Sequence, residues 1–309
     1  MTNKLKFVEY MHRRTGMSID LIDNIIFNSD KEFSKVTIYT EHKRRALYIP
    51  SNQLKLIQIC LIDYYFKGIP VSDNAHGYIR NKSIKSNALV HQGQTYFFQT
   101  DISSFFPSID EPRLRATLIK VIPNITIDEL DMIIRIVAPF GRLDLGSPTS
   151  PILSNIVMKE VDDKLLVELE KLHIHDLKYS RYSDDITISS KAILNTSLAD
   201  LVESVLRQFD FIMNKKKTKF KVLSDNLKIT GVYLNSDRTL TVGAKIKKKL
   251  KKYLYQIERG QDTEIKGEQV LGLLSFVKDI EPEYYLKLIL KYSKNEENIV
   301  SKVKELINK

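Results

Sequence analysis

The stretch "KYSRYSDDITISS", Lys178–Ser190, places Asp184 and Asp185 side by side between two segments in which apolar and polar residues alternate. Alternation is typical of β-strands, so this stretch predicts a hairpin with the two aspartates at its tip. Ser and Asp are common turn residues, and a simple turn is one interpretation. The other is a metal site, because a bound cation makes clustered carboxylates favourable. A metal site would need a third carboxylate from elsewhere in the chain.

Asp101 is the candidate for that third carboxylate. It ends an aromatic, strand-like segment in "TYFFQTDISSFFPSI", residues 95–109. If this strand neighbours the hairpin, Asp101, Asp184 and Asp185 meet at one edge of a sheet. Hard oxygen ligands of this kind suit Mg²⁺, which is usually held by one or two carboxylates together with substrate phosphates. Two such ions would support attack by a hydroxyl and departure of pyrophosphate.

The composition favours a nucleic-acid partner. The chain has 309 residues and a net charge of +10, with 43% hydrophobic and 28% charged residues. A basic globular protein commonly binds nucleic acid, and a membrane surface is the rival partner. No uncharged apolar run is long enough to span a bilayer, and the N-terminus lacks a signal-peptide core, so we expect a cytoplasmic protein without a membrane partner. The single cysteine, Cys60, is expected to pack as a small hydrophobe.

The order of the predicted elements indicates an α+β fold. Between residues 95 and 222 a strand, a helix, a hairpin, a helix and a further strand follow one another, which predicts an antiparallel sheet with helices on one face. Residues up to about Lys67 read as mainly helical, interrupted by a short strand in "KRRALYIP". "LKITGVYL" reads as one further strand. From Ala244 the chain is helical and basic, and Pro282 is placed as a first-turn residue of a helix.

Two motifs resemble those of reverse transcriptases. "YSDD", residues 182–185, is similar to the Tyr-x-Asp-Asp signature, and "DISSFF", residues 101–106, is similar to the first palm motif. The resemblance implies a right-hand polymerase fold. It would comprise N-terminal helices and fingers over 1–90, a palm over 91–236 with finger elements between about 111 and 145, and a basic helical thumb over 237–309. It also implies that two Mg²⁺ ions are held by Asp101, Asp184, Asp185 and the backbone carbonyl of Ile102.

The same resemblance assigns residues to the incoming deoxynucleotide. Phe106 would be the steric gate against a 2′-hydroxyl, with core packing as the alternative. Gly146, in "GSPTSPILSN", would allow close approach of the backbone, although Leu145 stands where the family usually has Gln. Lys43 and Arg45 would grip the triphosphate, and a guanidinium can do so bidentately. Lys217, in "NKKKTKF", would protonate pyrophosphate, with Lys216 as a competitor.

Two further motifs resemble those of the retron type. "SNALVHQG" has an Asn-Ala-x-x-His pattern with Asn87 and His91, and "LKITGVYL" is similar to a Val-Thr-Gly motif with Thr230 and Gly231. The resemblance implies that these residues bind a cognate structured RNA. It implies DNA synthesis from a guanosine 2′-hydroxyl, which gives branched, RNA-linked single-stranded DNA (msDNA). A role in defence against phage with an effector encoded nearby, and trimming of the template by a host RNase H, belong to the same expectation.

The basic helix from Ala244 is expected to lie along nucleic acid. "AKIKKKLKKYLYQIERG" places Ile246, Leu250, Leu254 and Ile257 on one helical stripe. The lysines outside this stripe that we assign to RNA binding are Lys247, Lys248, Lys251 and Lys252. A solvated helix face without a partner is the alternative.

Three other functions compete with a retron enzyme. A group II intron enzyme would be expected to carry a maturase region after the thumb. A diversity-generating reverse transcriptase would leave the Asn-Ala-x-x-His pattern unexplained. An RNA-binding scaffold with a vestigial polymerase site would fit the unusual Leu145.

Overall fold

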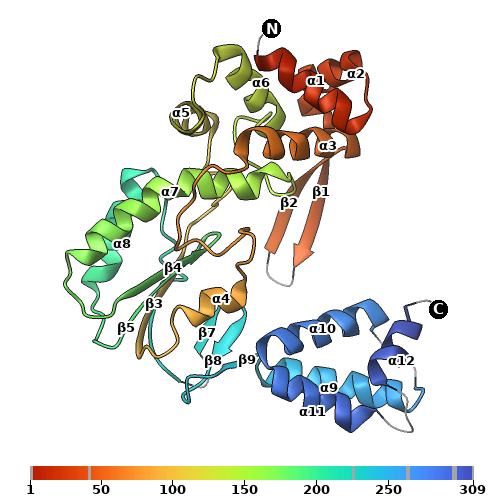
Figure 1. The fold of residues 1–309 in the computed structure, drawn as a ribbon. Helices are drawn as coiled ribbons and strands as arrows, with labels where there is room; N and C mark the ends of the chain where they lie inside the picture. The colour runs from red at the N-terminus through yellow and green to blue at the C-terminus, as the bar shows by residue number, and fades with distance from the viewer. Residues whose placement is uncertain (1–2, 41–42, 225–226, 262–264, 294–297, 308–309) are drawn as a thin grey trace.

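The computed structural model describes residues 3–40, 43–224, 227–261, 265–293 and 298–307. Three parts follow one another in Figure 1: N-terminal helices with a two-stranded hairpin, a central sheet with helices, and a C-terminal group of helices. The predicted mixture of helices and antiparallel strands is confirmed. None of the helices in these ranges is both long and apolar enough to cross a lipid bilayer.

The N-terminal part combines helices with the hairpin β1–β2. Its elements are α1 (Asn3–Thr15), α2 (Ile19–Phe27), the 3₁₀ turn η1 (Ser29–Glu32), β1 (Phe33–Thr40), β2 (Lys43–Pro50), α3 (Asn52–Leu61), the π-helical turn η2 (Ile62–Phe66), α5 (Glu111–Val121) and α6 (Ile127–Val137). The sequence predicted only one short strand here, whereas β1 and β2 pair along their whole length. A capping box between Thr126 and Glu129 starts α6, and the Asp110 side chain caps the start of α5.

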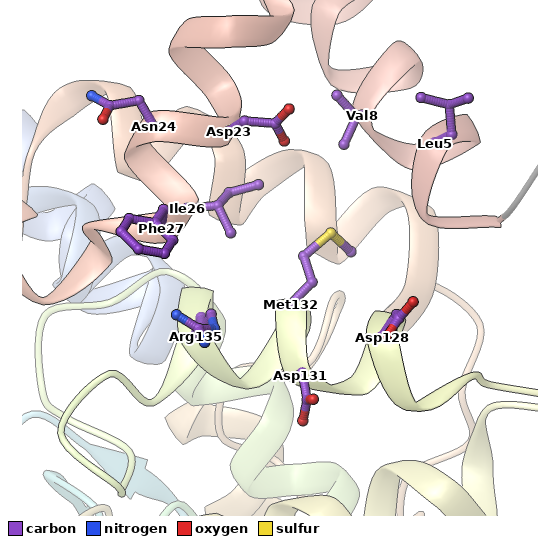
Figure 2. Close-up of a pocket in the computed structure, with 10 residues that line it drawn as sticks. All are labelled: Leu5, Val8, Asp23, Asn24, Ile26, Phe27, Asp128, Asp131, Met132 and Arg135. Carbon is purple, nitrogen blue, oxygen red and sulfur yellow. The ribbon is translucent and has the colours of Figure 1, made fainter.

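A hollow of about 770 Å³ lies between α1, α2 and α6. Figure 2 shows Asp23, Asp128 and Asp131 around it, together with the apolar side chains of Phe27 and Met132. Against these three carboxylates stands one cation, the Arg135 guanidinium, so the net negative charge of the hollow repels phosphate groups. The hollow is therefore a poor site for a nucleotide or a nucleic-acid backbone.

The central sheet is antiparallel, with strand order β4-β5-β3-β6. Its strands are β3 (Tyr96–Asp101), β4 (Lys178–Tyr182), β5 (Asp185–Ser190) and β6 (Lys219–Val222). The helices α7 (Thr149–Glu170) and α8 (Ser197–Gln208) pack on one face of this sheet (Figure 1). The apolar stripe of α7, from Ile156 to Leu169, is buried in the core shared with the N-terminal helices. Cys60 is buried in that core as expected.

The opposite face of the sheet is covered as well. The short helix α4 (Ile84–Leu89) and the turn after it bury polar positions of β4 and β5, where His91 contacts the buried Ser180 and Ser189. Alternation in the sequence correctly predicts two faces. It does not show that the polar face is internal.

The C-terminal part has a core of its own. It contains β7 (Leu227–Ile229), β8 (Val232–Leu234), β9 (Leu240–Thr241), α9 (Ala244–Glu258), α10 (Gly267–Ile280), α11 (Pro282–Tyr292) and α12 (Ile299–Glu305). "LKITGVYL" is a tight hairpin rather than one strand, because the chain reverses at Thr230–Gly231 between β7 and β8. The β7–β9 sheet shares its apolar core with the helices α9 to α12, and Ala88 and Phe97 join that core. Residue 237 lies between β8 and β9, and the predicted domain boundary there stays a prediction.

Candidate active site

Asp101 and Asp185 face each other on neighbouring strands. The antiparallel register of β3 and β5 pairs Asp101 with Asp185. Side chains paired in this way have Cβ atoms about 4.5–5.5 Å apart. Asp184 lies in the turn before β5, where its carbonyl accepts a hydrogen bond from the Ile102 N–H at 3.1 Å. The structure thus brings together the segments that carry all three predicted carboxylates.

The electrostatics of this cluster fit a bound cation. Asp101 is buried, and its Oδ1 has no hydrogen-bond partner, while its Oδ2 accepts from the Lys217 ammonium group. Burial in the cleft, together with the charges of Asp184 and Asp101, raises the pKa of Asp185 to about 6. An orphaned buried oxygen and repelling carboxylates both cost free energy, and a divalent cation would relieve both.

The carboxylates alone do not enclose an ion. Within the described ranges, no group of three or more His, Cys, Asp or Glu side chains forms a ready-made metal site. Mg²⁺ typically takes few protein ligands and completes its shell with water and substrate phosphates. The N–H of Ile102 is engaged and its side chain is buried, so its carbonyl is the one group it could offer an ion. These residues fit the predicted ligand set, and their role as ligands stays a prediction.

Lys217, rather than Lys216, contacts the carboxylates. The Lys217 ammonium group donates to Asp101, and this hydrogen bond raises the pKa of Lys217. Lys216 is exposed. The turn at Asn214, whose carbonyl accepts from the N–H groups of Lys217 and Thr218 at 3.0 and 3.1 Å, sets this register. The geometry therefore favours Lys217 for the predicted role of proton donor.

Next to the carboxylates is a basic cleft of about 280 Å³. Asp101, Asp185, Thr230 and Gly231 line it, together with the four lysines Lys217, Lys219, Lys221 and Lys228. Burial and the nearby Lys219 charge lower the pKa of Lys221, which means that the positive charges of these lysines repel one another. Sequence reasoning missed Lys219, Lys221 and Lys228. The signal for Lys219 and Lys221 is alternation in "KFKV", which puts these two lysines on the same face of β6.

The residues assigned to the nucleotide are differently placed. Phe106 is buried, at 7% exposure, with its ring 5.3 Å from that of Phe105 and 6.3 Å from that of Tyr78. Gly146 has φ +112°, and a Cβ there would lie 2.6 Å from the Tyr48 carbonyl oxygen. Gly146 is therefore required for close packing of its loop on β2, whatever its contact with a nucleotide. Leu145 is half-buried against the core.

Lys43 and Arg45 lie on β2, opposite Thr40 and Ile38 of β1. Their side chains lie outside the part of the structure that is described. The predicted triphosphate contact stays a prediction.

Asn87 and His91 lie inside the protein. The ring nitrogens of His91 lie 2.6 Å and 2.8 Å from the hydroxyls of Ser189 and Ser180, and the ring is completely buried. Burial and the neighbouring His76 lower the pKa of His91 to about 3. The Asn87 amide is also buried and donates to the Thr230 hydroxyl at 2.9 Å. Both side chains join elements inside the protein, and their role in RNA binding stays a prediction.

Thr230 and Gly231 form the β7–β8 turn at the edge of the basic cleft. Thr230 has φ +43°, which is unusual for a β-branched residue. The hydrogen bond from Asn87 holds this strained turn beside the carboxylates. Asn87 of the first motif and Thr230 of the second are thus connected inside the protein. Of these motif residues, only Thr230 and Gly231 line the cleft.

The lysines of α9 are not equivalent. Lys247 pairs with Glu281 at 2.5 Å and lies over the Tyr284 ring at 4.6 Å. Lys251 lies 5.8 Å from the same ring, whereas Lys248 and Lys252 are exposed. Leu250, Leu254 and Ile257 are buried as the stripe predicts. Lys247 therefore has a structural role in the thumb, and the other three stay candidates for RNA binding.

Sequence reasoning also missed the ion pair of Arg181 and Asp162. Both side chains are 0% exposed, and they meet at 2.7 Å. The available signal is Asp162 itself, a carboxylate three residues before Leu165 on the apolar stripe of α7. A charged residue at such a position needs a partner. The sequence does not show which basic residue supplies it.

Comparison with known proteins identifies the family. The family model for "Reverse transcriptase (RNA-dependent DNA polymerase)" matches residues 34–234. Retron Ec73 reverse transcriptase of Escherichia coli is 31% identical over 268 residues, which cover 80% of this chain and 83% of that protein. Retron Ec86 reverse transcriptase of Escherichia coli is 25% identical, covering 93% of this chain and 88% of that protein.

A solved structure of telomerase from Candida albicans, in complex with a fragment of telomeric RNA, is 12% identical, with a TM-score of 0.45, and the match covers 94% of this chain and 65% of that one. The sequence relatives decide the assignment. The chain belongs to the retron reverse transcriptases, RNA-directed DNA polymerases with the right-hand fold.

Proposed function

We propose that Asp101, Asp184, Asp185 and the Ile102 carbonyl hold two Mg²⁺ ions for DNA synthesis. Reverse transcriptases generally use divalent metals. The observation that supports this site is the register pair Asp101–Asp185, with an orphaned buried oxygen on Asp101 and the Asp184 turn beside it. Bound there, the ions would supply charge neutralisation for the attacking hydroxyl and the leaving pyrophosphate.

The remaining residues of the site bind and orient. Lys217, whose ammonium group contacts Asp101, would hold a proton there and deliver it to pyrophosphate. Lys219, Lys221 and Lys228 line the cleft that leads from the carboxylates to the Thr230 turn. Their crowded positive charge suits a phosphate backbone, whose binding would relieve their repulsion. Phe106 would exclude a ribose, and Lys43 and Arg45 would grip the triphosphate of the incoming dNTP.

We also propose the retron reaction for this chain. The template is a cognate structured non-coding RNA, and synthesis starts from a guanosine 2′-hydroxyl to give msDNA. The family membership and the Asn87–Thr230 hydrogen bond, which ties the two retron motifs together, support this proposal. In the cell we place the protein in the cytoplasm and in defence against phage, with a partner effector and a host RNase H that trims the template.

Primer extension tests the site. Asp101→Asn, Asp184→Asn and Asp185→Asn should each lose DNA synthesis on an RNA template while RNA binding is kept. The matched control is Asp163→Asn, which alters an exposed aspartate of α7 paired with Lys159. Substantial synthesis by Asp101→Asn or Asp185→Asn would overturn the assignment, and loss in the control would show a general effect.

A second measurement tests the retron reaction. Asn87→Ala should spare extension of an annealed primer and lower the yield of branched, self-primed DNA on the cognate RNA, because the Thr230 turn loses its support. Thr230→Ser keeps the hydroxyl and should resemble the unmodified enzyme, whereas Thr230→Val should resemble Asn87→Ala. Equal loss of both products in Asn87→Ala would remove the support for a role specific to self-priming.

A further inference from the structure

The turn that carries Asp184 is held from beneath by a buried charged network. Arg181 donates from Nη1 to the Ser183 carbonyl at 3.0 Å and to the Asn155 Oδ1 at 3.1 Å. Its Nε and Nη2 donate to the Asp162 carboxylate at 2.9 Å and 2.7 Å. Every nitrogen of the guanidinium is therefore engaged within the protein.

This network fixes the peptide planes on both sides of Asp184. The Ser183 carbonyl, just before Asp184, accepts from Arg181, and the Asp184 carbonyl accepts from the Ile102 N–H. Ser183 has φ +59°, a conformation that side-chain-bearing residues seldom adopt. A turn in such a conformation persists only where its surroundings hold it.

A second element closes around the same turn. The segment 74–77 runs along the edge strand β4, where the Arg181 N–H donates to the Asn74 carbonyl at 2.8 Å and the His76 N–H donates to the Arg181 carbonyl at 2.7 Å. The Asn155 amide donates to the Gly77 carbonyl at 2.8 Å. A Cβ at Gly77 would lie 2.7 Å from the Ser183 backbone nitrogen. The absence of a side chain at Gly77 is what lets this segment approach the turn.

We infer that Arg181, Asp162, Asn155 and Gly77 are positioning residues, which set the orientation of Asp184 and Asp185 without touching substrate. The inference rests on the proposed function of these aspartates as metal ligands. A buried ion pair adds little to stability compared with well-packed apolar residues. The ion pair matters here because it holds the Arg181 guanidinium in the orientation that donates to the Ser183 carbonyl. An apolar pair of similar volume would fill the space but could not donate that hydrogen bond.

Gly77→Ala is the first test, because it disturbs the turn without removing a buried charge. Gly272→Ala on α10 is the matched control, since a Cβ there meets no atom within 4 Å. With an RNA template and an annealed primer, Gly77→Ala should lower kcat by about 10²-fold, the scale of a misplacement near 1 Å. Binding of Mn²⁺ alone, followed by electron paramagnetic resonance, should weaken in parallel. Affinity for the template–primer should stay unchanged, and Gly272→Ala should match the unmodified enzyme in all measurements.

The second test replaces the network by apolar side chains in the triple variant Arg181→Met, Asp162→Leu and Tyr179→Phe. Tyr179 is included because its hydroxyl donates to Asp162 at 2.5 Å. A folded triple variant with unchanged melting temperature, weakened Mn²⁺ binding and lowered kcat supports the inference. Unchanged Mn²⁺ binding and kcat in either Gly77→Ala or a folded triple variant would overturn it. Asp185→Asn, measured in the same assays, distinguishes failure of the metal site from failure of the positioning role. If Asp185→Asn is active, the metal site is refuted. If Asp185→Asn is inactive but Gly77→Ala is fully active, only the positioning role is refuted.

Discussion

Phe106 is the residue at which packing and substrate selection are hardest to separate. Its ring is buried between Phe105 and Tyr78. Phe106→Ala should let ribonucleotides compete with deoxynucleotides, because the wall against the 2′-hydroxyl is removed. Phe105→Ala is the matched control: it opens a cavity beside Phe211 at a similar cost, about 3–5 kcal/mol, without changing sugar selection. Competition between labelled ribo- and deoxynucleotides measures the difference, and equal selectivity in both variants would make Phe106 a core residue only.

His91 links stability to pH. Its pKa is near 3 in the folded protein, below the ordinary 6.5, so between these values the unfolded chain binds a proton that the folded chain does not. The free energy of unfolding should therefore fall as pH is lowered from about 6.5 toward 3, with a limiting slope of about 1.4 kcal/mol per pH unit from this group. Urea unfolding at several pH values measures the slope. His91→Gln should be less stable near neutral pH and show a shallower slope, and an unchanged slope would contradict neutral burial of the ring.

At the scale of elements, the thumb helix α9 combines a buried stripe with an exposed basic face. Changing Lys248, Lys251 and Lys252 to Gln should weaken RNA binding and flatten its dependence on salt. Each lost phosphate contact should remove about 0.7–0.9 from the slope of log affinity against log salt. Lys247 is left in place, since it pairs with Glu281. The control is the double variant Lys159→Gln and Lys164→Gln on α7. An equal loss of slope in this control would mean that the change in net charge, rather than contacts of α9 with RNA, causes the effect.

Some elements can be predicted from local signals, and others depend on contacts between distant segments. The starts of α5 at Glu111 and α11 at Pro282 follow from a capping aspartate and a first-turn proline. The β7–β8 hairpin was missed because Thr230 adopts a positive φ that only the distant Asn87 supports. The period of two residues predicted the strands and the hairpin, whereas the position of β3 beside β5, with Asp101 opposite Asp185, was only a condition of the predicted metal site. No periodicity could show that Arg181 pairs with Asp162 on another element.

For the whole molecule, two apolar cores meet at β3. Phe98 belongs to the core of fingers and palm, whereas its neighbour Phe97 belongs to the thumb core. Phe97→Ala and Phe98→Ala should both lose about 3–5 kcal/mol of stability, since each opens a buried cavity. Hydrogen exchange should accelerate in α9 and α10 only for Phe97→Ala. Equal acceleration in both variants would mean that the two cores unfold as one unit.

The crowded charges of the cleft also bear on how much of this protein a cell can keep. Lysines and carboxylates that repel their own kind make the ligand-free protein less stable than it would be with its polyanion and cations bound. A ligand that binds only the folded form adds to the free energy of unfolding in proportion to the logarithm of its concentration. Copies made in excess of their RNA would populate the unfolded state more often and be removed faster by proteases. The stability of the protein should therefore rise with the concentration of the nucleic acid that binds the cleft.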